Sequence, residues 1–132
     1  MKIQIKNRHQ IEKATFLPKT ALISITDRNY HFAELKDKPD YLLQLAFDDV
    51  DRDEEGGIAD EQAKQIAEFY LNIKDKAEII ICQCEHGQSR SAAIAAAIME
   101  YRSRSGIKIF AHEKYYPNKA IFNKVFEELK KL

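Results

Sequence analysis

The sequence predicts one α/β domain spanning residues 1–132, with a mostly parallel central sheet flanked by helices on both faces. Two observations predict this fold class. Short apolar runs typical of strands alternate along the chain with longer segments whose apolar residues recur at helical spacing. No linker interrupts that alternation, and 132 residues are enough for a single hydrophobic core.

Four segments are expected to form strands. Residues 1–6 interleave charged and apolar side chains, as a strand at the surface would. Residues 21–26 and 79–82 are mainly aliphatic, which predicts buried strands. In residues 41–47 the apolar side chains alternate toward the end of the segment, and this pattern defines one face of a further strand.

Three segments are expected to form helices. Residues 63–73 carry a one-sided apolar stripe that would lie on the sheet, and Gly56 with its glycine neighbour provides a flexible entry. Residues 91–101 are alanine-rich and largely apolar on all sides, which predicts a helix buried at the centre. Residues 118–129 form another stripe, with Asn118 as the predicted N-cap.

A cysteine and an arginine with five residues between them lie where the apolar run 79–82 gives way to a helical pattern. The intervening turn would aim free backbone N–H groups into one small space, and these donors attract an anion together with the helix dipole. Cys84 would be the nucleophile, because a helix N-terminus stabilises its thiolate. The parallel N–H donors of Arg90 match two phosphoryl oxygens. The segment therefore predicts a phosphate site.

The other positions of this loop support the same chemistry. Gly87 lets the backbone curl around an oxyanion and adopt positive φ at little cost. The Ser91 hydroxyl is placed to hydrogen-bond the Cys84 sulfur, whereas His86 is expected to point away from bound phosphate. The predicted phosphate-binding loop comprises Glu85, His86, Gly87, Gln88, Ser89 and Arg90.

At these residues the sequence resembles the cysteine-dependent protein tyrosine phosphatases, whose signature is Cys-x5-Arg followed by Ser or Thr. The resemblance covers residues 20–132 and is strongest to the compact dual-specificity branch and to small bacterial or phage-borne tyrosine phosphatase-like proteins. It implies a phosphotyrosine phosphatase, with phosphoserine and phosphothreonine as further substrates, that forms a phosphocysteine intermediate and uses no metal or organic cofactor. One departure is Gln83, because the family usually has histidine immediately before the cysteine.

The resemblance also implies an acid at a strand end that protonates the leaving oxygen. Asp49 is the first choice, because it is similar in position to the acid of relatives that read Phe-x-Asp, and Asp48 remains the alternative general acid. Residues 48–55 contain six acids and one arginine, and like charges favour the protonated form of a carboxyl group.

Metal sites are not expected. Three aspartates at alternating positions, with Asp60 eleven residues after the first, suggest a calcium-binding loop. However, its sixth position holds Glu54 instead of glycine, and its twelfth holds aspartate instead of glutamate. Cys82 is expected to fill the core, and the Cys82-Gln-Cys84 spacing lacks the other ligands of a zinc site.

Two pairs of neighbouring residues are left out of the predicted site. Asp27 and Arg28 follow a strand and are interpreted as a turn with a solvated charge pair. Tyr115 and Tyr116 are interpreted as aromatic packing beneath the last helix.

Charge and composition limit the partners. Twenty-one basic and twenty-one acidic residues cancel, so neither nucleic acid nor a membrane surface is implied, and the expected partner is a phosphoprotein or phosphopeptide. No long apolar segment or signal peptide is present, which predicts a cytoplasmic location. The loop lacks the lysines of inositol-phosphate-cleaving relatives, so phosphoinositides are disfavoured as substrates. The sequence makes no prediction of oligomeric state.

Three functions are therefore weighed. The first is a phosphomonoester hydrolase, and the second is a phospho-binding pseudophosphatase that turns over little because Gln83 weakens activation. The third is a rhodanese-like sulfurtransferase, since those domains also place a cysteine in an anion-cradling loop before a helix. Retention of Cys84 and Asp49 favours hydrolysis over binding alone, and the arginine with the upstream acid favours phosphate over sulfur transfer.

Overall fold

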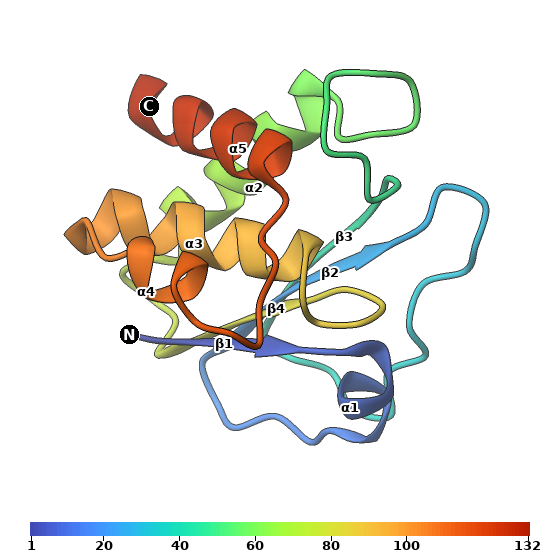
Figure 1. Cartoon of the computed structure of the whole chain (residues 1–132). Helices are drawn as coiled ribbons and strands as arrows, with labels where there is room; N and C mark the ends of the chain where they lie inside the picture. Colours follow the sequence, from blue (N-terminus) through green and yellow to red (C-terminus); the bar gives the residue numbers. More distant parts are fainter.

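The central sheet of the computed structural model, which describes residues 1–132, has four strands in the order β1-β4-β2-β3 (Figure 1). All three strand pairings are parallel. The strands are β1 Lys2–Lys6, β2 Thr20–Thr26, β3 Tyr41–Ala46 and β4 Ile79–Gln83. Each lies within a residue or two of the segment predicted from the sequence, and the predicted α/β class is confirmed.

Helices lie on both faces of the sheet, but unequally (Figure 1). The helices are α1 Arg8–Lys13, α2 Asp60–Ile73, α3 Arg90–Ser103, α4 Ile107–Phe110 and α5 Lys119–Lys131. Three of them, α2, α3 and α5, were predicted, and they form one layer on the sheet with α4 beside α3, whereas α1 lies on the opposite face. None of the helices has both the length and the apolar character needed to cross a bilayer.

The central strand β2 is buried along its whole length because both of its faces are covered. Its alternate residues Ala21, Ile23 and Ile25 belong to the large core under α2, α3 and α5. Leu22 points to the opposite face, into a smaller cluster. That cluster is formed by Leu22, Ile11 of α1, Ala33 and Ile81. Burial on both faces explains why the strand has a nearly continuous apolar run instead of a strict alternation.

Helix α3 is the most deeply buried helix, and every residue from Arg90 to Ile98 is buried. It packs against α5 on one side and against β1 and β4 on the other. Its alanines allow those neighbours to approach closely on all sides. The predicted central helix is thereby confirmed, and its first residue immediately follows the loop that ends β4.

The carboxyl ends of the four parallel strands meet at one edge of the sheet. Asn7 follows β1, Asp27 follows β2, Phe47 follows β3 and Cys84 follows β4. In open α/β sheets this edge is where ligands bind. The candidate site is therefore built from segments that the sheet brings together.

We expect Ile94→Ala in α3 to lower the free energy of unfolding by about 2–5 kcal/mol, because it leaves a cavity at a fully buried position of the main core. Urea denaturation followed by circular dichroism measures the change. Ile107→Ala is the control, since that side chain is 66% exposed and its loss should change stability by less than about 0.5 kcal/mol. Equal effects of the two substitutions would contradict the central position of α3.

Candidate active site

The loop of residues 84–90 joins β4 to α3 and turns its carbonyl groups away from its centre. The Glu85 carbonyl accepts a hydrogen bond from the Arg8 backbone N–H at 3.2 Å, and the Gln88 carbonyl accepts one from the Tyr116 N–H at 2.8 Å. No backbone N–H group of the loop donates a hydrogen bond to another protein group. The loop therefore has carbonyls held by neighbouring segments and amides left free for an anion.

Gly87 allows this loop to lie close to the end of β1. Its φ is +66°, and a Cβ atom there would be 2.9 Å from the Asn7 backbone nitrogen and 2.9 Å from the Lys6 carbonyl carbon. The loop thus needs glycine for two reasons, the left-handed backbone and the close approach.

Cys84 lies at the base of the loop, against the first turn of α3. Its sulfur is 3.1 Å from the Ser91 hydroxyl and accepts a hydrogen bond from the Ser91 backbone N–H at 3.4 Å. Donors at this position stabilise a thiolate. The neighbouring Cys82 is fully buried, and burial raises the pKa of its thiol, so that it stays protonated and serves as a core residue as predicted.

Gln83 takes the position of the usual histidine and is buried. Its side-chain oxygen accepts a hydrogen bond from the Ser24 hydroxyl of β2, and its Nε2 donates to the Cys84 carbonyl at 3.1 Å. The neutral amide therefore connects the central strand to the base of the loop. It orients the backbone around the cysteine without adding a positive charge.

Arg90 is buried, with 4% of its surface exposed. Its Nη1 donates to the Asp27 carboxylate at 2.7 Å and to the Phe47 carbonyl at 2.8 Å. Its Nε, in contrast, is buried without a hydrogen-bond partner. A buried, unpaired donor on a charged group is unfavourable, so the arrangement fits a ligand that accepts from this nitrogen. An oxyanion held between Nε and the loop amides meets that requirement.

Asp27 and Arg28 are exposed and lie at a turn as predicted, but their interpretation as a charge pair is wrong, because each contacts a different strand end. Asp27 contacts Arg90. Arg28 donates to both oxygens of Asp48, from its backbone N–H at 3.0 Å and from Nε at 3.1 Å. The backbone hydrogen bond from Arg28, followed by its guanidinium, holds the pKa of Asp48 below its ordinary value of 3.8. Asp48 is therefore an ionised structural partner at neutral pH.

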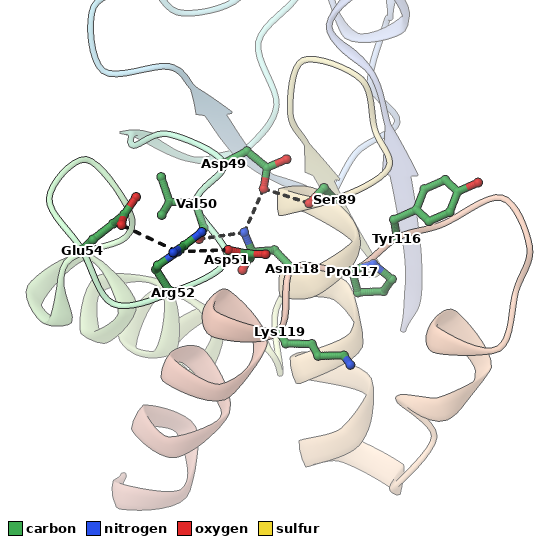
Figure 2. A pocket seen from close by; sticks show the side chains of 10 residues that line it. All are labelled: Asp49, Val50, Asp51, Arg52, Glu54, Ser89, Tyr116, Pro117, Asn118 and Lys119. Atoms are coloured by element: carbon green, nitrogen blue, oxygen red, sulfur yellow. Dashed lines mark hydrogen bonds and ion pairs between the residues drawn. The ribbon is translucent and has the colours of Figure 1, made fainter.

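Asp49 lies beside the loop and is held by two donors on one oxygen (Figure 2). Its Oδ1 accepts from the Ser89 hydroxyl at 2.8 Å and from the Asn118 amide at 2.8 Å. Asn118 also donates to the Val50 carbonyl and caps α5 through the Ile121 N–H, which confirms the predicted N-cap. The sequence did not reveal that Asn118 contacts Asp49, because the two residues are sixty-nine positions apart in the chain. Oδ2 of Asp49 has no partner within the protein.

The remaining aspartates of this segment diverge instead of gathering around one point. Asp51 lies near Arg52, whereas Asp53 and Asp60 both contact Lys124 on α5. No group of three or more acidic, histidine or cysteine side chains is arranged to hold a metal ion.

A cavity of about 620 Å³ opens next to Asp49 and Ser89, between the acidic segment and the start of α5 (Figure 2). It is lined by Asp49, Val50, Asp51, Arg52, Glu54, Ser89, Tyr116, Pro117, Asn118 and Lys119.

Tyr116 is 70% exposed at the rim of this cavity, so its predicted packing beneath the last helix is wrong. The Tyr116 backbone N–H donates to the Gln88 carbonyl of the loop at 2.8 Å. His86 is also exposed.

Solved structures with this fold are phosphatases and phosphatase-like proteins. Human DUSP28 is 15% identical with a TM-score of 0.56, over 98% of this chain and 92% of that one. PTPMT1 in complex with PI(5)P is 15% identical with a TM-score of 0.54, over 85% and 78%. The human tyrosine phosphatase-like serine/threonine/tyrosine-interacting protein is 21% identical with a TM-score of 0.51, over 82% and 74%. No protein-family model and no curated protein sequence matches the chain.

We expect Gly87→Ala to lower the free energy of unfolding by at least about 1 kcal/mol and to weaken binding of inorganic phosphate, because alanine is strained at positive φ and its Cβ meets the backbone of Lys6 and Asn7. Urea denaturation and phosphate titration measure the two effects. Gly57→Ala is the control, since Gly57 has no positive φ and its nearest neighbour is a Val50 side-chain atom. A Gly87→Ala protein as stable as the control would contradict the role given to this glycine.

We expect Asp48→Asn to destabilise the protein at pH 7 by less than about 1 kcal/mol, the range for exposed ion pairs. Because the folded-state pKa lies below 3.8, the contribution of Asp48 is fully present above that pH. It is lost as the pH falls through the folded-state value, so the difference in stability between the variant and the wild type should shrink as the pH falls below 3.8. Urea denaturation at pH 7, 5 and 3 tests this, and a difference that does not change with pH would contradict it.

Proposed function

We propose that the chain, which has the fold of the dual-specificity phosphatases, is a phosphomonoester hydrolase that acts on phosphotyrosine in a protein or peptide, with phosphoserine and phosphothreonine as further substrates. The main support is the buried Arg90 Nε, which has no protein partner and belongs to the same loop as the free backbone amides. Together they offer donors to a phosphate dianion in the loop that Cys84 begins, and the Cys84 sulfur is itself anchored at the start of α3.

In the first step, the Cys84 thiolate attacks phosphorus in line with the leaving oxygen. A sulfur–phosphorus bond forms as the bond from phosphorus to that oxygen breaks. Arg90 and the loop amides stabilise the charge on the equatorial oxygens of the transferring group. The proton of Asp49 moves to the leaving oxygen, which departs as the hydroxyl of the dephosphorylated side chain.

In the second step, water attacks the phosphorus of the phosphocysteine intermediate. Asp49, now a carboxylate, accepts the proton of that water, and the sulfur–phosphorus bond breaks to release inorganic phosphate. The Ser91 hydroxyl, 3.1 Å from the sulfur, donates to the departing thiolate and so lowers the barrier to its release.

Asp49 is the better candidate for the general acid because of the partners of the two aspartates. Both oxygens of Asp48 accept hydrogen bonds from Arg28, and its lowered pKa keeps it ionised. Asp49 uses a single oxygen for Ser89 and Asn118, so its other oxygen is available to carry a proton beside the loop.

Binding without turnover is the second candidate, and Gln83 supports it. At the base of the loop this neutral side chain supplies hydrogen bonds but no positive charge to favour the thiolate. One protein of the same fold is the human tyrosine phosphatase-like serine/threonine/tyrosine-interacting protein. A binder would keep the arginine and amide donors and hydrolyse little.

We expect the wild type to hydrolyse para-nitrophenyl phosphate and a phosphotyrosine peptide without added metal. Cys84→Ser should abolish turnover but keep peptide binding, and Arg90→Ala should lose both. Asp49→Asn should lower the rate on the peptide by about 10²–10⁴-fold and lose the basic limb of its pH profile, whereas Asp48→Asn should keep that limb. The loss on para-nitrophenyl phosphate should be smaller, because nitrophenolate leaves readily without protonation.

Controls separate the competing functions. Asp75→Asn changes an exposed aspartate in the α2–β4 connection, at the opposite edge of the sheet, and should behave as wild type. A wild type that binds the phosphopeptide without hydrolysing it would replace the hydrolase with the binder. Transfer of sulfur from thiosulfate to Cys84, seen as a mass increase, would instead indicate a sulfurtransferase.

A further inference from the structure

We infer that Asp27 is a positioning residue that fixes the orientation of the Arg90 guanidinium and thereby the geometry of phosphate binding. The inference rests on the proposed function, because it concerns the same anion site. Asp27 is outside the Cys-x5-Arg loop and sixty-three residues from Arg90 in sequence. It reaches the arginine only because β2 and β4 are neighbours in the sheet.

The guanidinium is planar, so fixing one of its nitrogens fixes the directions of the other two. Nη1 has two acceptors, the Asp27 carboxylate at 2.7 Å and the Phe47 carbonyl at 2.8 Å. The contact with Asp27 is charge-assisted and short, whereas the contact with Phe47 is to a neutral group. With Nη1 occupied in this way, the edge that contains the unpartnered Nε is the edge left for a ligand.

Asp27 is itself held in place. It follows β2 directly, and its carbonyl accepts a hydrogen bond from the Tyr30 N–H at 3.1 Å, which closes a turn. The next residue, Arg28, is tied to Asp48 after β3 through two hydrogen bonds. The carboxylate that contacts Arg90 therefore projects from a turn that continues directly from β2 and is tied through Arg28 to the segment after β3.

Asp49 and Asp27 both lie beside the loop, but their carboxylates have different partners. Asp49 contacts only uncharged donors, those of Ser89 and Asn118. Asp27 forms an ion pair with the arginine, although its side chain is 55% exposed. A carboxylate that accepts from Nη1 in this way orients the cation. Removing it should therefore change anion binding and not the protonation step.

The test compares Asp27→Ala and Asp27→Asn with the wild type, using inorganic phosphate and orthovanadate as competitive ligands. We expect Asp27→Ala to weaken phosphate binding and lower kcat/KM by about tenfold, the equivalent of one hydrogen bond to a charged group. Asp27→Asn should lose less, because its amide oxygen still accepts from Nη1. The loss should be the same for aryl phosphates whose leaving groups differ in pKa. Asp75→Asn, a matched loss of one exposed carboxylate, should change neither quantity.

A double variant distinguishes positioning from general structural damage. If Asp27 acts through Arg90, then Asp27→Ala should have no further effect in an Arg90→Ala background. Independent losses that multiply would overturn the inference. Thermal unfolding of each variant accompanies the measurement, and Asp27→Asn, which preserves the shape of the side chain, supplies the comparison if Asp27→Ala does not fold.

Other results also overturn the inference or separate it from the proposed function. Phosphate affinity that is unchanged in Asp27→Ala but lost in Arg90→Ala would overturn the inference while the proposed function stands. A loss that grows with the pKa of the leaving group would identify Asp27 as a general acid instead of a positioning residue. If the wild type binds phosphate but turns nothing over, the hydrolase proposal fails, and phosphate affinity alone still tests Asp27.

Discussion

One buried guanidinium connects three strand ends, and the site depends on it. Arg90 begins α3 just after the loop of β4, and its Nη1 contacts Asp27 after β2 and the Phe47 carbonyl after β3. A charge buried in this way is tolerated only when it is paired. The pairing therefore fixes the relative positions of the loop of residues 84–90 and of the segment that carries Asp49.

The sequence predicts those parts of the site that are encoded locally. Cys84, Gly87, Arg90 and Ser91 lie within eight residues between an apolar strand and an alanine-rich helix, so spacing alone indicates an anion site. The short helices α1 and α4 were not predicted, because six and four residues are too few to show a helical period. Asp27 was also missed, since its partner depends on strand order, which no local pattern reports.

Gln83 makes the hydrogen bonds that hold the base of the loop, but it carries no charge. At the base of the loop a side chain must accept from Ser24 and donate to the Cys84 carbonyl, and an amide can do both. The sequence indicates only that a charge is absent there. The geometry adds that the backbone around the sulfur is nevertheless fully supported. Gln83 therefore keeps the hydrogen bonds that support the loop but places no charge beside Cys84.

The burial of α3 implies that the two sides of the candidate site differ in local stability. From Ala93 to Ile98 this helix is buried and its backbone amides lie within the helical hydrogen-bond pattern, so amide hydrogens there should exchange with solvent only when the whole domain unfolds. Residues 51–55, which follow Asp49, are exposed throughout and have no regular structure. Their amides should exchange through local fluctuations. Cys84, the proposed nucleophile, therefore packs against a helix that stays folded as long as the domain does, whereas Asp49, the proposed acid, precedes a segment that rearranges within the folded state.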